Sequence, residues 1–401
     1  MNTNQSLVYQ AFSLLLALLG ASALSGLAFR ARLALRRQLP RFATVGEPLS
    51  YRVIVRNETG RTQRDLCIVE DLPDPRPSFE EFVQSREPGE ERRNWFDRKV
   101  GYFRWTWLLS RNRAAVCGEH PLPPLPPRGE GEVRVELVPL KRGYLGLRGA
   151  TVLRPDPFGV FKAAVTIPAR ESVLVLPRRY ALPRFELPGT RKYQHGGVAL
   201  ASSVGDSEEF VSLRDYRPGD PLRRLHWKSL AKLGKPVVKE YQDEFFVRHA
   251  LVLDTFLDAP QSDRFEEAVS VAASFACAID TQESLLDLLF VGPEAYCFTA
   301  GRGLGHVDRM LEILACVRPC RDRSFAALHH LVIERRAALS GCIAILLAWT
   351  EERRRFLGHL ASLGVPTLVF LVTEAGALEP DVPESVHRLE VGRVAEGLAR
   401  L

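Results

Sequence analysis

Residues 205–244 read GDSEEFVSLRDYRPGDPLRRLHWKSLAKLGKPVVKEYQDE and separate two parts of the chain with different sequence patterns. Before this segment, one long apolar run is followed by apolar residues that alternate with polar ones. After it, short apolar runs alternate with stretches of helical spacing. We therefore expect a membrane anchor and a β domain on the N-terminal side, and an α/β domain on the C-terminal side.

The 205–244 segment contains a predicted helix with both ends marked. Asp220 is a good N-cap, Pro221 suits the first helical position, and Gly234 suits the C-terminal stop. Between them one face is apolar and the other is largely basic (Leu222, Leu225, Leu230 and Leu233 against Arg223, Arg224, Lys228 and Lys232). A β-prone run at 236–241 follows and closes the segment.

Basic charge is concentrated in this segment. From Arg214 to Lys239 there are eight Lys or Arg and two Asp, an excess as large as the net charge of +6 of the whole chain. Six acidic residues flank the basic core (Asp206, Glu208, Glu209, Glu240, Asp243 and Glu244). We expect most of these charges to pair internally; the alternative is a basic surface for an acidic protein, a phosphate or an anionic lipid headgroup.

Two ordered motifs resemble a known family. The first follows the pattern R-x-Y-x-x-G-D-x-x-R-x-I-x-W-K, and this chain supplies Arg214, Tyr216, Gly219, Asp220, Arg223, Leu225, Trp227 and Lys228. The second, R-G-x-Y followed by D-P-x-G-L-F, is matched by residues 141–144 and 156–161. Together they resemble the domain-of-unknown-function family numbered fifty-eight, and the resemblance spans nearly the whole chain.

The resemblance implies a von Willebrand factor A-like C-terminal domain and a MoxR-type AAA+ ATPase as partner. The expected mechanism is that of an adaptor, which docks the ATPase and presents client or envelope proteins. The expected docking or bracing network lies in the 205–244 segment, with Trp227 packing it (Arg214, Asp215, Tyr216, Gly219, Asp220, Arg223, Arg224, His226, Trp227 and Lys228).

The N-terminus predicts one spanning helix. Residues 7–29 carry no charge, and at helical rise such a run is long enough to cross a bilayer core of about 30 Å. A signal peptide is the competing interpretation, but residues 1–6 lack its basic region. Five arginines follow the run, and the positive-inside rule then places the soluble bulk in the cytoplasm (Arg30, Arg32, Arg36, Arg37 and Arg41). The anchor and its basic juxtamembrane segment are assigned to residues 1–40.

Residues 41–180 predict a β-sandwich. Apolar and polar residues alternate in several short runs bounded by turn residues (Leu49 to Val55, Leu66 to Val69, Tyr102 to Trp107, Val133 to Val138, Tyr144 to Leu153 and Val173 to Leu176). Two irregular insertions interrupt them, a charged one at 80–93 and a proline-rich one at 121–127. No catalytic constellation is visible here, so we expect a platform. Residues 181–246 are assigned as a linker with the 205–244 segment.

Residues 247–401 predict a doubly wound α/β domain, because strands and helices alternate. The expected strands are 250–253, 285–291, 343–348, 367–372 and 386–391, and the expected helices are 264–279, 307–317, 325–338 and 352–363. In von Willebrand factor A-like domains, D-x-S-x-S after the first strand holds a divalent metal. Here the position reads Asp254-Thr-Phe-Leu-Asp258, and Phe256 has no ligand atom. We expect no cofactor, with Mg²⁺ or Ca²⁺ on Asp254 and Asp258 as the alternative.

Two other functions remain open. One is a hydrolase or transferase using His226 with Asp215 or Asp220, and the other is an outward-facing metal-dependent adhesion module. The first lacks a visible nucleophile and base arrangement. Nucleic acid is not expected as a partner, because no reading module is present and membrane topology explains the juxtamembrane arginines. No motif indicates a small-molecule substrate. We therefore expect an interaction protein rather than an enzyme.

Overall fold

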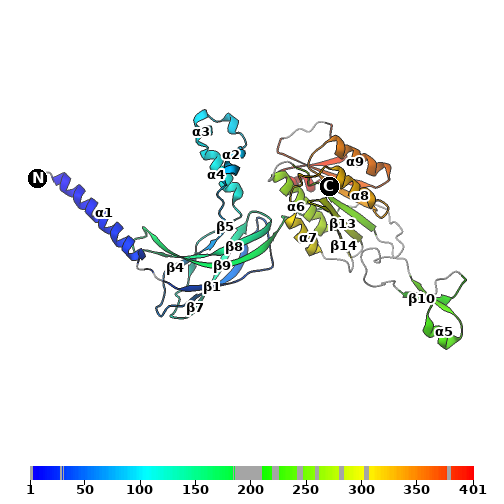
Figure 1. Cartoon of the computed structure of the whole chain (residues 1–401), viewed down its shortest axis with the longest axis horizontal. Helices are drawn as coiled ribbons and strands as arrows, with labels where there is room; N and C mark the ends of the chain where they lie inside the picture. Colours follow the sequence, from blue (N-terminus) through cyan, green and yellow to red (C-terminus); the bar gives the residue numbers. More distant parts are fainter. Residues whose placement is uncertain are drawn as a thin grey trace. The chain divides into compact units, whose positions relative to one another are not determined.

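The computed structural model describes residues 3–27, 29, 31–183, 185, 210–218, 225–241, 247–257, 262–279, 284–301, 307–376 and 381–401. The chain divides into two compact units, Met1–Pro177 and Arg178–Leu401. Figure 1 shows both units.

The first unit begins with one apolar helix, α1 (Thr3–Leu27). Within it Leu7–Gly26, 20 residues, is long and apolar enough to cross a membrane, although a signal sequence near the N-terminus has the same properties. The last turns of α1 contact the turn after β8: the Ser22 hydroxyl donates to Asp156, and Arg154 Nη2 donates to the carbonyl of Ser25 at 3.3 Å. Asp156 belongs to the second family-like motif, so this motif holds the base of the helix.

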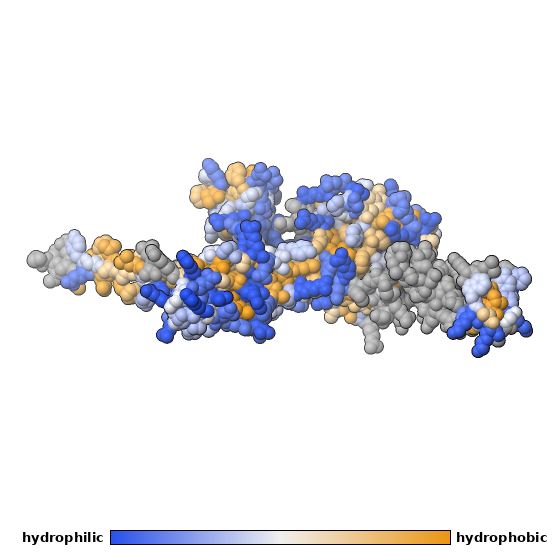
Figure 2. Space-filling view, turned by 60° about the horizontal axis from the view of Figure 1, so that its bottom comes forward, coloured by the Kyte–Doolittle hydropathy of each residue, from blue (hydrophilic) through white to orange (hydrophobic). Residues whose placement is uncertain are grey.

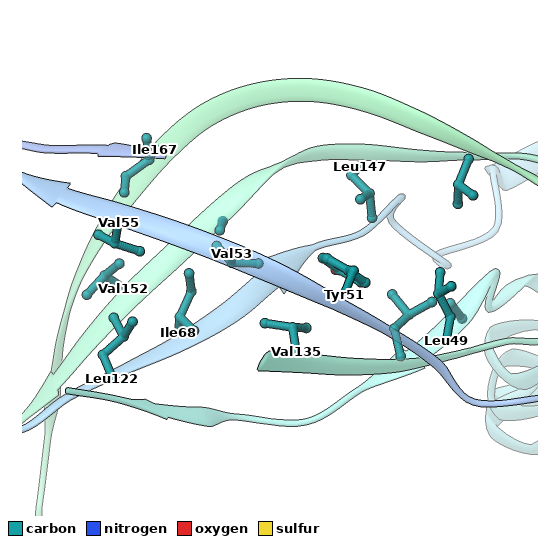
Figure 3. Packing of buried hydrophobic residues seen from close by; sticks show 14 of the residues in the cluster. Leu49, Tyr51, Val53, Val55, Ile68, Leu122, Val135, Leu147, Val152 and Ile167 are labelled. Carbon is teal, nitrogen blue, oxygen red and sulfur yellow. The ribbon is translucent and has the colours of Figure 1, made fainter. Parts of the chain in front are cut away.

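Two sheets form the body of the first unit. The four-stranded sheet has the order β1 (Leu33–Gln38), β3 (Leu49–Asn57), β7 (Glu130–Pro139), β5 (Ala115–Cys117). The five-stranded sheet has the order β2 (Phe42–Thr44), β9 (Lys162–Leu176), β8 (Gly143–Pro155), β4 (Leu66–Asp71), β6 (His120–Leu122). Alternate residues of β3 point inward and join residues of the other sheet in one core (Figure 3). The period-two pattern therefore predicts this body correctly in outline.

The start of the sheets differs from the prediction. Strand β1 begins at Leu33 and pairs antiparallel with β3, from Leu33 opposite Asn57 to Gln38 opposite Arg52. Arg36 and Arg37 therefore lie in a strand rather than in a juxtamembrane segment, and the Arg37 side chain is fully buried. Two of the six residues of this strand are arginines, so the sequence lacks the alternation of apolar and polar residues that predicts a strand.

A helical excursion connects β4 to β5. It comprises α2 (Phe79–Gln84), the 3-10 turn η1 (Glu90–Arg92), α3 (Trp95–Val100) and α4 (Tyr102–Asn112), and it projects from the sheets in Figure 1. The strand predicted at 102–107 is wrong, because this run is the first part of α4. Trp105 packs edge-on against Phe82 of α2, and Leu108 is buried, so helix packing overrides the β propensity of the aromatic residues. The insertion predicted as irregular at 80–93 contains α2 and η1.

The second unit contains a six-stranded sheet of order β14 (Ala295–Ala300), β13 (Ser284–Val291), β12 (Val247–Leu253), β15 (Gly341–Leu346), β16 (Thr367–Thr373), β17 (Val386–Glu390). All neighbours are parallel except β14, which pairs antiparallel with β13. Counted along the chain from β12, the order is 3-2-1-4-5-6, which doubly wound sheets share. The sequence misses β14, because an edge strand with half-exposed residues lacks the apolar run of its buried neighbours.

Helices cover both faces of this sheet. The helices α8 (Ala326–Glu334) and α9 (Glu351–Ser362) pack on the face that includes Ala250 and Val252. On the other face, α6 (Asp263–Ala278) places Phe275 against Phe370 of β16, and α7 (Val307–Cys316) lies beside α6. The short α10 (Val394–Leu398) follows β17 and contacts it. The strands and helices predicted from the sequence agree with these within a few residues, apart from the shorter α8.

Candidate functional site

The 205–244 segment folds locally into a hairpin with a short helix between its strands. Strand β10 (Phe210–Asp215) pairs antiparallel with β11 (Val237–Tyr241), so that Arg214 lies opposite Val238 and Asp215 opposite Val237. The helix α5 (Trp227–Leu233) precedes β11 and ends at Gly234, whose φ of 66° is the left-handed conformation that glycine tolerates best. The predicted C-terminal stop and the predicted β run are therefore both confirmed.

The start of α5 differs from the prediction. Leu225, expected on the helix face, forms an isolated bridge with Val238, and the His226 amide donates to the carbonyl of Val237 at 2.8 Å. These bonds keep the backbone extended up to His226, so the described helix begins at Trp227. Leu225, Val237 and Val238 are buried together and form the small core of the hairpin.

The hairpin brings part of the predicted network together. Arg214, Asp215 and Tyr216 follow one another at the end of β10, and the Tyr216 amide donates to the carbonyl of Pro236 at 3.0 Å. This bond ties the end of β10 to the residue that precedes β11. Gly219, Asp220, Arg223 and Arg224 lie outside the described residues.

His226, Trp227 and Lys228 occupy the start of α5. The Trp227 side chain is 65% exposed and Lys228 is exposed, so Trp227 does not have the packing role expected of it. The His226 ring contacts the Ser229 hydroxyl at 2.6 Å. A nucleophile and base pair needs a third group that orients the base, and no carboxylate among the described residues hydrogen-bonds this ring.

A second group of polar residues lies at the carboxyl ends of β12 and β15. Asp254 follows β12 and is fully buried, and its Oδ2 accepts from the Leu347 amide at 3.0 Å and from Arg353 Nε at 2.6 Å. Its Oδ1 accepts from the Phe256 amide at 3.0 Å. The strand order reverses between β12 and β15, and ligands of open α/β sheets bind at such a switch point. Asp254 therefore occupies the position where a ligand group is expected.

Arg353 supplies the positive charge at this position. Its guanidinium lies 4.8 Å from the centre of the Phe325 ring and donates from Nη1 to Thr350 Oγ1 at 3.0 Å. A guanidinium thus contacts the carboxylate of Asp254, the first residue of the position that corresponds to D-x-S-x-S. Asp258, the second metal candidate, lies outside the described residues. In the described ranges no group of three or more His, Cys, Asp or Glu side chains has a metal-binding arrangement.

Sequence reasoning did not find Arg353. The signal for it is weak but physical: Arg353, Phe356 and Leu360 are the buried residues of α9, at helical spacing, so one cation lies on an otherwise apolar face. A buried cation needs a counter-charge. The sequence does not show that the partner is Asp254, which is 99 residues away.

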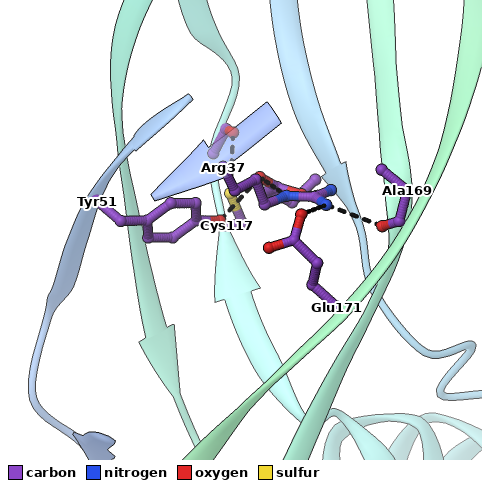
Figure 4. A network of polar contacts seen from close by, with 7 residues as sticks. Arg37, Tyr51, Cys117, Ala169 and Glu171 are labelled. Carbon is purple, nitrogen blue, oxygen red and sulfur yellow. Dashed lines mark hydrogen bonds and ion pairs between the residues drawn. The ribbon is translucent and has the colours of Figure 1, made fainter. Parts of the chain in front are cut away.

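A third polar network lies inside the first unit. Arg37 of β1 forms a two-pronged contact with Glu70 of β4, with Nη2 to Oε2 at 2.7 Å and Nε to Oε1 at 3.1 Å. Tyr51 of β3 donates to Glu70 at 2.8 Å. Arg37 Nη1 donates to the carbonyl of Ala169 in β9 at 2.8 Å (Figure 4). Burial, and then the negative charge of Glu70, raise the pKa of Tyr51. The network joins the two sheets, and the side chains of Arg37 and Glu70 have no exposed surface, so we interpret it as a structural brace.

Comparison with known proteins gives one curated relative. The chain is 28% identical over 182 residues to the uncharacterized protein YeaD of Bacillus subtilis, a match that covers 45% of this chain and 44% of the relative. The chain thus spans less than half the length of this relative, whose name states no activity.

Solved structures resemble the chain only distantly. A CARDB domain from Pyrococcus furiosus is 14% identical and covers 36% of this chain and 94% of its own, with a TM-score of 0.19. A cohesin module from Clostridium perfringens is 12% identical and covers 36% of this chain and 98% of its own, with a TM-score of 0.14. At these TM-scores neither likeness carries an argument about fold or function. The family model described as "Protein of unknown function DUF58" matches residues 212–358, a range that contains β11, Asp254 and Arg353.

Proposed function

We propose that this protein is a membrane-anchored interaction protein that faces the cytoplasm and works as an adaptor for a MoxR-type AAA+ ATPase. The observation that carries the proposal is the hairpin of the 205–244 segment, in which the aromatic and basic side chains at the start of α5 are exposed. An exposed Trp suits a protein contact, since Trp is enriched at such interfaces and among the residues that dominate their energies. A reaction site would instead enclose its polar groups.

The anchoring proposal rests on α1 and on the residues after it. The stretch Leu7–Gly26 is long and apolar enough to span a bilayer. Arg32 and Arg41 lie on the C-terminal side of the helix, and by the positive-inside rule they favour a cytoplasmic location for the folded units. Arg37 does not contribute, because Glu70 neutralises it inside the sheets.

For the folded units we propose a β-sandwich followed by a von Willebrand factor A-like domain. The two-sheet body of the first unit and the 3-2-1-4-5-6 sheet of the second support this assignment. Asp254 stands at the end of the first strand of that sheet, as in the metal-binding members, but it is held by Arg353. The domain would therefore bind its partner through protein groups rather than through a shared metal. The choice of ATPase and of client proteins comes from the family resemblance.

Co-purification tests the proposal. The full chain, extracted in detergent, is expected to retain a MoxR-type ATPase from the same cells, and the double substitution Arg223→Glu with Arg224→Glu is expected to abolish retention. A matched control is Arg321→Glu with Arg323→Glu, which makes the same charge change at two exposed arginines of the same unit. Undiminished retention by the first variant would remove the 205–244 segment from the interface, and absence of the ATPase from wild-type preparations would reject the partner.

Orientation has its own test. Protease added to intact cells is expected to leave the folded units uncut, whereas the same protease is expected to digest them in lysed cells. Digestion in intact cells would place the units outside and favour an adhesion module.

A further inference from the structure

The helical excursion of the first unit carries an exposed aromatic and basic surface that the proposed function does not use. We call residues 92–103, RRNWFDRKVGYF, the α3–α4 tip. Gly101 ends α3 and caps α4 with a φ of 69°, and a Cβ at this position would lie 2.6 Å from the Phe82 ring. The chain can therefore turn sharply and close to α2, which places the α3–α4 tip at the end of the excursion.

Large apolar side chains of the α3–α4 tip face solvent. Trp95 is 66% exposed, and Phe96 and Tyr102 are each 61% exposed; Val100 and Phe103 are exposed as well. In Figure 2 the same projection shows hydrophobic residues directly beside hydrophilic ones. Exposed clusters of large apolar residues with a polar rim mark interaction sites.

The polar rim of the tip is positive. Arg92, Arg98 and Lys99 are exposed, and residues 92–113 contain seven Lys or Arg against one acidic residue, Asp97. Three acidic residues of the first half of the excursion are paired, whereas Glu80 and Glu91 are exposed. Glu87 pairs with Arg93 at 2.9 Å, Glu90 pairs with Arg104, and Glu81 accepts from Asn112 at 3.0 Å. These contacts neutralise three nearby carboxylates, and Arg92, Arg98 and Lys99 of the tip remain exposed.

Two contacts hold the aromatic and basic groups together at the tip. The guanidinium of Arg93 lies 3.8 Å from the centre of the Phe103 ring, and Lys99 Nζ lies 5.7 Å from that of Trp95. These cation–π contacts fix basic groups beside apolar rings. A surface of this kind matches the boundary between charged headgroups and acyl chains in a bilayer.

We propose that the α3–α4 tip docks on the surface of a bilayer with anionic headgroups. Trp and Tyr rings are enriched at the headgroup level of membranes, and each Lys or Arg near an anionic surface contributes attraction. The inference rests on the proposed anchoring by α1, which belongs to the same unit: a tethered tip meets the bilayer at a high effective concentration, so weak individual contacts suffice. Docking would give the unit a second attachment and fix its orientation on the membrane.

Tryptophan quenching tests the inference. The full chain is reconstituted into vesicles whose acyl chains carry bromine, which quenches tryptophan on contact, with phosphatidylcholine alone or with phosphatidylglycerol added. We expect stronger quenching in the anionic vesicles. Trp95→Phe is expected to remove this additional quenching, even though the variant keeps four of the five tryptophans of the chain.

Charge reversal sharpens the test. Arg98→Glu with Lys99→Glu is expected to lower the ratio of docked to undocked chain by about fivefold for each basic charge removed, and 1 M salt is expected to act in the same direction. The matched control, Arg56→Glu with Arg61→Glu, changes two exposed arginines of the same unit away from the tip and is expected to leave quenching unchanged.

Three outcomes would overturn the inference: no Trp95-dependent quenching in a chain that remains inserted, equal quenching with and without anionic lipid, or a tip-dependent dimer that forms without lipid. Failure of the anchor is a separate result, because it would appear as release of the chain from membranes by alkaline carbonate.

Discussion

Among the described residues, one deeply buried arginine pairs with a carboxylate in each unit, and the two pairs differ in their surroundings. Arg37 and Glu70 join strands of two facing sheets, and both side chains have no exposed surface. Arg353 and Asp254 join a helix to the end of a strand, at the switch point of a mostly parallel sheet. The first pair is enclosed by Tyr51 and Ala169, whereas the second lies where such sheets bind ligands.

The comparison shows that a buried arginine–carboxylate pair can have different roles in the two units. Burying an ion pair seldom adds net stability over an apolar replacement, but removing one partner leaves an uncompensated charge. In the first unit we interpret the pair as a brace between the two sheets. In the second unit the arginine also determines what Asp254 can bind, because the carboxylate already accepts three hydrogen bonds.

The largest expected effect comes from the enclosed pair. Arg37→Met should lower the free energy of unfolding of the first unit by about 3–5 kcal/mol, because Glu70 remains buried without its counter-charge. Amide hydrogen exchange in increasing denaturant measures this on peptides from β1, β3 and β4 of the full chain, and peptides from β12 and β15 serve as an internal control.

A double variant distinguishes charge from packing in this pair. Arg37→Met with Glu70→Gln removes both charges and keeps an acceptor for Tyr51, so we expect it to recover most of the lost stability. If the double variant is as unstable as the single one, packing of the arginine rather than its charge holds the sheets.

Breaking the Arg353–Asp254 pair at the switch point should cause the next largest loss of stability. Arg353→Met is expected to cost about 3 kcal/mol, near the lower end for a buried pair, since the arginine is 8% exposed on its side chain. Exchange of peptides from β12, β15 and α9 measures it. The substitution also tests the metal alternative, because it frees the Asp254 oxygen that Arg353 contacts.

We expect millimolar Mg²⁺ to leave the melting temperature of the wild-type chain unchanged. In Arg353→Met, a rise with Mg²⁺ that disappears in Arg353→Met with Asp254→Asn would show that the arginine takes the place of a cation. A rise in the wild-type chain that is lost in Asp254→Ala would instead restore Mg²⁺ or Ca²⁺ as a native ligand.

The two pairs also show how far sequence reasoning reaches. The apolar run of α1, the alternation of strands and helices in the second unit and the stop at Gly234 are local patterns, and each is found in the structure. The pairs are not local: 33 residues separate Arg37 from Glu70, and 99 separate Asp254 from Arg353. Arg37 looked like a juxtamembrane charge because its strand has few apolar residues.

Other errors have the same origin in tertiary contacts. The run Tyr102 to Trp107 has the composition of a strand, but packing against Phe82 makes it a helix. Leu225 has helical spacing with Leu230, but its bridge to Val238 keeps it extended. In the candidate site, the sequence singled out Asp254 and the 205–244 segment. It could not show that the Arg353 guanidinium hydrogen-bonds the Asp254 carboxylate.

The smallest expected effect is a loss of stability of the second unit in acid, caused by two histidines of that unit. Burial lowers the pKa of His249 in β12, whose Nδ1 has no hydrogen-bond partner, and burial followed by the charges of His359 and His330 lowers the pKa of His329 in α8. The unfolded chain therefore binds these protons at a higher pH than the folded chain does. Stability of the second unit is fully present above the ordinary histidine pKa of 6.5 and falls as the pH drops below it, with a slope of at most about 1.4 kcal/mol per pH unit for each proton.

Hydrogen exchange between pH 5 and 7.5, corrected for intrinsic rates, measures this loss in peptides of β12 and α8. His249→Leu should reduce the slope, because it removes one of the two groups and leaves no buried polar atom. His120→Gln is the matched control in the first unit and should leave the slope of the second unit unchanged. An acid slope that survives both His249→Leu and His329→Gln would assign the sensitivity to groups other than these two histidines.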